Sequence, residues 1–385
     1  MLALRLARGT HPIVLLRRLL VAAASAGVGF LLLCTLGYAV GHPAHSTGSL
    51  LRLLWCLAPI TATVQFAVAV ARTDPSTSPP RAGLSAVGLG PAHLTALAAV
   101  STAVSCTLGS SLALLFFLHL RGDLSGLPFD GAAAGLLAAH QPLPLAAALT
   151  LLCVVPVAAA TASAMALRPR PAEPSDEPAP AQPVPTGLPW GAALTAAGLA
   201  VEAYASKGTP DAPLPLPGRI DVLPAGVLVG WALTALGLAL AGPGVTYLCG
   251  RVLQSVRPGA VRLLAGRVLM GESRRIGRPL GVVCAVASAA IAAATLYDAG
   301  ATPHPVGPLT GLGATLVLGC TVATLLTATL ESKHARTETT KALVRLGAPT
   351  QALRTAAAVR AAALLTTFAP LTWAVAELAA LPLKP

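Results

Sequence analysis

The sequence predicts an all-α membrane protein that crosses the bilayer about nine times, with eight to ten as the range. Charged residues make up only 10% of the 385 residues, whereas a soluble domain carries about 25%. Hydrophobic residues make up 55% and lie in runs long enough to span a membrane, for which about 20 residues suffice. Small side chains dominate these runs, and they let helix backbones approach closely in lipid.

The predicted spans can be placed in order along the chain. The fifth is the weakest because it is short and contains Glu202, and the last is long and contains Pro370. A proline inside a helix removes a hydrogen bond and introduces a kink, so the last run is either one kinked span or a span followed by a re-entrant tail. The runs cover residues 13–40, 50–71, 93–120, 143–167, 188–205, 224–248, 277–297, 309–330 and 352–382.

The distribution of basic residues predicts the orientation. Lys and Arg concentrate in the cytoplasmic segments of membrane proteins. With nine spans and a cytoplasmic N-terminus, all but five of the 26 Lys and Arg residues lie in cytoplasmic segments. The Ala, Leu, Arg and Pro bias is typical of a GC-rich bacterium, so we expect a bacterial inner-membrane protein. The cytoplasmic Lys and Arg residues then account for the net charge of +12, so no nucleic-acid partner is expected. The basic residues outside the predicted cytoplasmic segments are Arg52, Arg121, Lys207, Arg219 and Lys384.

The runs group into two related modules of three to four helices. Residues 168–187, rich in proline and acidic residues, cannot form a core and are predicted to be a disordered cytoplasmic linker. Residues 1–167 form the predicted first module, with four spans, and residues 188–248 form two connecting spans. Residues 249–385 form the second module, with an amphipathic helix followed by three spans.

One pattern occurs in both modules, in the cytoplasmic loops 73–92 and 331–350. Leu84–Ala103 (LSAVGLGPAHLTALAAVSTA) matches Leu343–Ala362 (LVRLGAPTQALRTAAAVRAA) without gaps, pairing Leu84 with Leu343 and Gly88 with Gly347. Each copy is predicted to be a short helix that ends at its glycine in the left-handed conformation and then enters the next span. Glu338, Lys341 and Arg345 have helix-surface spacing, so the second copy offers a docking surface for a cytosolic partner.

The stretch HARTETTKALVRLGAPTQALRTAAAVRAAAL resembles the cytoplasmic loop of the FtsX-like, MacB-type permeases of ABC transporters, where a charged helix runs into an LRxLGA signature. RAGLSAVGLGPAHLTALAAV is a less charged version of it. The resemblance is to an actinobacterial type without a large extracellular domain. It implies that the loops are coupling elements that rest on a cytosolic ATPase, through Arg81, Leu84, Gly88, Arg336, Lys341, Arg345 and Gly347.

The resemblance also implies the activity and the partners. The chain would be the permease subunit, and two copies of a separate ATPase would bind ATP and Mg²⁺. The transported compound would be hydrophobic or amphiphilic (a lipid, peptide or drug), exported or extracted from the membrane. Membrane lipids are further expected partners, and both a homodimer and a heterodimer of permeases remain open.

The residues themselves provide no catalytic machinery. The sequence lacks a GxxxxGK[ST] phosphate-binding loop, so no cofactor is expected in this chain and we predict that it is not an enzyme. Its cysteines form no CxxC pair, and no metal site is predicted. Glu202 and Glu377 lie in apolar runs, where an ionisable residue is a candidate proton or substrate contact. A secondary transporter and a non-transporting scaffold or sensor partner are therefore the alternative functions.

Overall fold

The protein is all-α, as predicted. The computed structural model describes residues 12–44, 46–73, 91–124, 131–135, 137–168, 185–207, 213–214, 223–255, 259–299 and 307–383. Within these residues, eight helical segments are long and apolar enough to cross a membrane. The only strands described are β1 (Pro213–Leu214) and β2 (Leu223–Pro224), which pair antiparallel over two residues each. The protein is therefore a multi-pass membrane protein.

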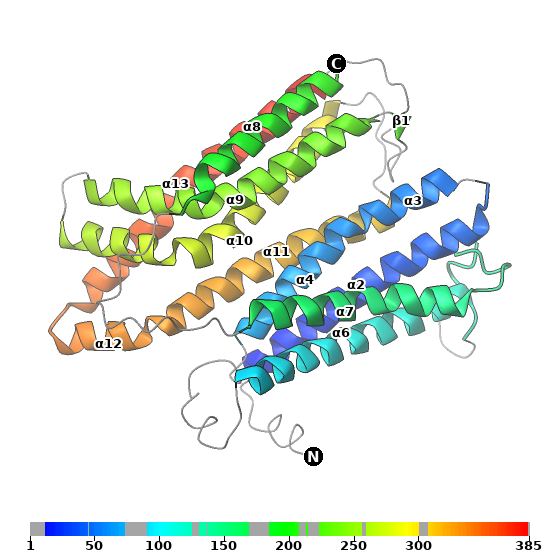
Figure 1. Cartoon of the computed structure of the whole chain (residues 1–385), viewed down its shortest axis with the longest axis horizontal. Helices are drawn as coiled ribbons and strands as arrows, with labels where there is room; N and C mark the ends of the chain where they lie inside the picture. The colour runs from blue at the N-terminus through cyan, green and yellow to red at the C-terminus, as the bar shows by residue number, and fades with distance from the viewer. Residues whose placement is uncertain are drawn as a thin grey trace. The chain divides into compact units, whose positions relative to one another are not determined.

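The chain divides into two compact units (Figure 1). Unit 1 comprises Met1–Ala172 and Val306–Thr324, and unit 2 comprises Glu173–Pro305 and Leu325–Pro385. The division runs through the single helix α11 (Pro308–Ala335), so this helix contributes its first part to unit 1 and its last turns to unit 2. The predicted module boundaries do not cut this helix.

Unit 1 is a bundle of helices around an apolar core. Besides the first part of α11, its described helices are α2 (Pro12–Gly41), α3 (Ser46–Trp55), α4 (Leu57–Arg72), α6 (Pro91–Arg121) and α7 (Leu145–Ala166). Val28, Leu32 and Phe66 are fully buried at its centre. Gly109 of α6 lies against the carbonyl of Ala22, where no side chain would fit.

Hydrogen bonds between helices support this bundle. The Ser25 hydroxyl donates to the Cys106 carbonyl at 2.9 Å, and the Ser110 hydroxyl donates to the Leu152 carbonyl at 3.1 Å. These two bonds connect α2 with α6 and α6 with α7. Small polar side chains hold helices together where apolar burial gives little driving force in lipid.

Unit 2 is built around α9 (Ala225–Ser255), which packs against α8 (Gly187–Ala205) on one side and α10 (Ala260–Ala299) on the other. It also contains α12 (Thr337–Arg345), α13 (Thr350–Ala380) and the short 3-10 turn η1 (Leu381–Leu383). The Ser288 hydroxyl of α10 donates to the Thr372 carbonyl of α13 at 3.1 Å, and this bond joins α13 to α10.

Glycines set the close approach of α8 and α9. Gly191 and Gly198 of α8 face Gly237 and Gly230 of α9, and a Cβ added at Gly230 would lie 2.8 Å from the Gly198 carbonyl oxygen. The seven-residue spacing places each pair of glycines on one helix face. The helices therefore meet backbone to backbone, the geometry that small residues allow between membrane helices.

The structure differs from the predicted spans at three places and decides between the two alternatives for the last run. The Arg-rich stretch predicted as a separate amphipathic helix continues into the span as part of α10, a single helix of 40 residues. The second span is divided at Cys56 into α3 and α4, because Pro59 has no N–H to bond the preceding turn. The last run is one helix that passes through Pro370, so the re-entrant alternative is wrong. The predicted fifth span is the helix α8, which is not among the eight candidate membrane helices.

Candidate functional site

The second repeat forms a short helix, α12, between the two long apolar helices α11 and α13. Its residues are exposed apart from a half-buried Leu343, among those whose side chains are described. Leu346, directly after the helix, exposes 84% of its surface, and Val344 is also exposed. Lys341 and Arg345 add positive charge to the same short element. The second copy of the repeat is thus an exposed short helix that combines apolar and basic side chains.

Gly347 ends α12 as predicted. Its φ is +89°, a left-handed conformation that side chains with a Cβ rarely adopt. The Gly347 N–H donates to the Val344 carbonyl and the Ala348 N–H donates to the Leu343 carbonyl, both at 3.0 Å. This pair of bonds is the Schellman arrangement. It turns the chain abruptly from α12 into α13, with Pro349 directly before the new helix.

Arg336 lies in the break between α11 and α12, and its side chain contacts α10. Its Nε lies 2.5 Å from Glu272 Oε1 of α10. Its Nη2 donates to the fully buried Ser332 hydroxyl at 2.7 Å. The guanidinium therefore connects the base of α12 to α10 through an ion pair that is mostly shielded from solvent.

The ion pair forms one wall of a cavity of about 180 Å³ in unit 2. We call it the unit 2 cavity. A single water needs roughly 10–15 Å³, so this cavity can hold a group of several atoms. Five of its ten lining residues are polar or charged and five are apolar, and they come from α9, α10, α13, α11 and the break after α11. The lining residues are Thr246, Leu269, Glu272, Ile276, Thr329, Arg336, Ala357, Arg360, Ala361 and Leu364.

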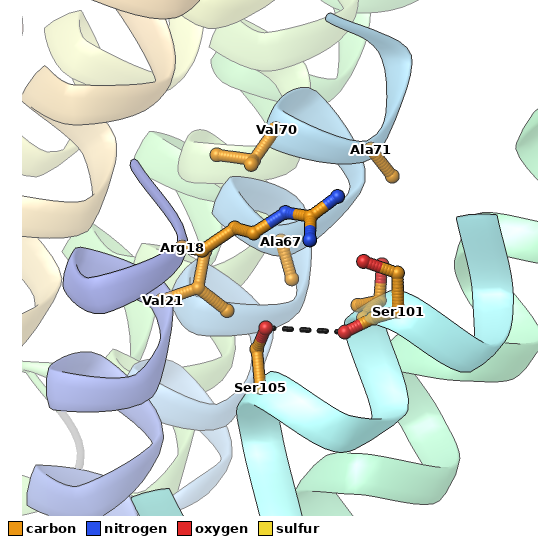
Figure 2. A pocket seen from close by; sticks show the side chains of 8 residues that line it. Arg18, Val21, Ala67, Val70, Ala71, Ser101 and Ser105 are labelled. Atoms are coloured by element: carbon orange, nitrogen blue, oxygen red, sulfur yellow. Dashed lines mark hydrogen bonds between the residues drawn. The ribbon is translucent and has the colours of Figure 1, made fainter. Parts of the chain in front are cut away.

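Unit 1 contains a smaller cavity at the corresponding place of the first repeat. This unit 1 cavity measures about 10 Å³, and Figure 2 shows the Arg18 side chain extending between α4 and α6 toward Ser101. The register that pairs Leu84 with Leu343 also pairs Ser101 with Arg360. The same register pairs Val70 with Thr329, and all four of these residues line a cavity.

The first of the two predicted coupling loops lies almost entirely outside the described residues. The predicted coupling residues Arg81, Leu84 and Gly88 fall within 74–90 and lie outside the described residues. The predicted residues of the second loop that the structure describes separate into two groups. Lys341, Arg345 and Gly347 belong to the exposed helix and its end, whereas Arg336 belongs to the ion pair beneath it.

Glu202 is fully buried between α8 and α9. Its Oε1 accepts a hydrogen bond from Trp231 Nε1 at 2.5 Å. Its Oε2 has no hydrogen-bond partner among the described residues. Glu377, the second predicted intramembrane acid, is half-buried on α13 and takes part in an interaction of its own. The structure does not bring these two carboxylates together in one described pocket.

Glu272 is the functional candidate that sequence reasoning missed. It is the single acidic residue between Arg251 and Arg278. A lone carboxylate among arginines is the sequence feature that could have pointed to an ion pair. The sequence predicts a surface helix over this stretch, before the span, and it does not predict the pairing of Glu272 with the distant Arg336. Glu272 lies within the single helix α10, and Arg336 directly follows α11.

Two further observations bound the chemistry of the site. Among the described residues, no group of three or more His, Cys, Asp or Glu side chains could hold a metal ion. No protein-family model, curated protein or solved structure matches the chain.

Proposed function

We propose that the chain is the membrane-spanning permease subunit of an ABC transporter of the FtsX-like type. A cytosolic ATPase would supply ATP hydrolysis, and the permease would export or extract a hydrophobic or amphiphilic compound. The observation that carries the proposal is α12, a short exposed helix with basic and apolar side chains between two membrane-length helices. Such a helix fits the groove-binding mode of helix recognition.

The Arg336–Glu272 ion pair supports the same proposal. A docking helix transmits force only if its base is attached to the spans that must move. Arg336 fulfils this condition for α12, because it links the helix start to α10. The Schellman end at Gly347 fixes the other end of α12 to α13.

The test is stimulation of ATP hydrolysis in a purified pair. The chain would be co-expressed with the Walker-motif ATPase encoded beside it, and the rate measured in nanodiscs. We expect Leu346→Asp and Arg345→Glu to abolish co-purification and stimulation. Thr350→Asp is the matched control, because it adds the same charge outside α12, at the exposed N-terminus of α13, where acidic residues are favourable. Stimulation that survives Leu346→Asp would contradict the proposal.

A secondary transporter is a second candidate, favoured by one observation. The Glu202 carboxylate is fully buried and one of its oxygens has no partner among the described residues, as expected for a proton-binding group in a span. Proton-coupled uptake into vesicles that is lost in Glu202→Gln, without any ATPase, would support this function. Transport that needs ATP and survives Glu202→Gln would exclude it. A chain that transports nothing under either condition would fit the scaffold alternative.

A further inference from the structure

We propose that the unit 2 cavity binds the phosphate headgroup of an anionic phospholipid. The cavity lies between α9, α10, α11 and α13, and it stands apart from the exposed face of α12. The proposal does not depend on the chain being an ABC permease, because it concerns a binding site for a membrane component.

The charge of the lining matches a phosphodiester. The cavity contains two arginines and one glutamate, and the glutamate is already paired with Arg336. No carboxylate among the described residues pairs with Arg360, which therefore leaves one positive charge in the cavity. A guanidinium binds phosphate through two parallel hydrogen bonds, so Arg360 is the residue that recognises the headgroup.

The position of the cavity matches the depth of a headgroup. Arg360 lies ten residues into α13, about 15 Å along its axis at 1.5 Å per residue. Glu272 lies at a similar depth from the start of α10. With the predicted orientation, both helices begin on the cytoplasmic side. The 40 residues of α10 extend to about 60 Å, twice the roughly 30 Å of hydrocarbon, so the first turns of this helix lie in the headgroup layer.

The composition of the lining favours a lipid over a free phosphate ion. Leu269, Ile276 and Leu364 place apolar surface beside the charged groups, and an acyl chain would cover it. The lining from α13 also includes Ala357 and Ala361, whose small side chains leave room for the ligand. Basic cavities between helices on the cytoplasmic side are the recognised form of headgroup sites in membrane proteins.

The first repeat explains why the unit 1 cavity is too small for such a ligand. In unit 1 the position of Arg360 is taken by Ser101, and the Arg18 side chain occupies the space between the helices (Figure 2). The remaining volume of about 10 Å³ is no more than one water requires. The lipid site is therefore predicted for unit 2 alone.

Native mass spectrometry of the purified full chain in a neutral detergent tests the site. Phosphatidylglycerol and phosphatidylcholine would be titrated separately, and the dissociation constant of the first bound lipid measured. We expect the chain to prefer phosphatidylglycerol, and Arg360→Gln to weaken this binding on the order of tenfold, the effect of losing a charged hydrogen bond. Ala361→Leu, which fills the cavity without changing charge, should weaken it equally.

Arg354→Gln is the matched control, because Arg354 is an exposed arginine six residues earlier on α13. It should leave the preference unchanged. Equal binding of the two lipids to the native chain would overturn the proposal, as would a preference that survives both Arg360→Gln and Ala361→Leu or an equal loss in Arg354→Gln. Displacement of phosphatidylglycerol by millimolar inorganic phosphate would overturn the lipid assignment in favour of a free-phosphate site.

Discussion

Arg336 Nε lies 2.5 Å from Glu272 Oε1, which joins the base of α12 to α10 across 64 positions of sequence. Both side chains are mostly shielded from solvent, with exposed fractions of 29% and 15%. Removing one partner of a shielded pair leaves the other charge without compensation. The ion pair therefore helps to fix the position of α12 relative to α10.

The first prediction concerns this pair. Glu272→Ala and Arg336→Ala should each lower the free energy of unfolding by roughly 1–3 kcal/mol, less than for a fully buried pair because both groups keep some solvent. Thermal unfolding in detergent measures the change. In a double-mutant cycle, the loss in the double variant should be smaller than the two single losses added together. Additive losses would show that the two residues do not interact.

The second prediction concerns the turn after α12. Gly347→Ala should destabilise the protein by about 1–2 kcal/mol, because φ is +89° and a Cβ is strained there. Gly311→Ala in α11 is the control. Nothing lies within 4 Å of a Cβ added at Gly311, so this change should be neutral or stabilising by up to about 1 kcal/mol. The melting temperatures of the two variants should therefore move in opposite directions or differ clearly.

The third prediction concerns the packing of α8 on α9. In Gly230→Ala the new Cβ would lie 2.8 Å from the Gly198 carbonyl oxygen and 2.9 Å from Glu202 Cβ, so the helices must separate. We expect a loss of roughly 1–3 kcal/mol, typical of overpacking. Gly271→Ala, where a Cβ meets nothing within 4 Å, is the matched change on α10. Hydrogen exchange of α8 should accelerate in the first variant only.

The fourth prediction concerns Glu202 and Trp231. Trp231→Phe removes the hydrogen-bond donor to Glu202 Oε1 and leaves a buried carboxyl group without this partner, which costs about 1–3 kcal/mol. Glu202→Gln keeps an oxygen acceptor for the indole and should be milder. Thermal unfolding ranks the two variants. A larger loss in Glu202→Gln would mean that the charge itself, rather than the hydrogen bond, stabilises this interface.

Much of the fold is predictable from the sequence because membrane-length apolar runs have few alternative structures. In lipid, backbone groups must bond within the chain, so long apolar segments become helices. The turn at Gly347 was also predictable, since a glycine after a helical pattern is typical of a left-handed C-cap. The positions of α6, α7, α9 and α13 follow the same rule.

The ion pair and the cavity were not predictable in this way. The family resemblance implies that Arg336 is a coupling residue, whereas the structure pairs it with Glu272, which is distant in the chain. Such pairing depends on the tilt and register of packed helices, which the glycines of α9 and α10 determine. The continuity of α10 through Pro279 likewise depends on tertiary packing, because an isolated helix would tend to break there.

We propose that α12 is the surface through which this membrane protein contacts an ATPase. Site-specific photo-cross-linking in native membranes tests it most directly, with the probe at Leu346 and a control probe at exposed Trp373 in the last third of α13. The account predicts a cross-link from position 346 to a cytosolic protein that carries a Walker nucleotide-binding motif, and none from position 373. Cross-links from position 346 to lipid alone would contradict it.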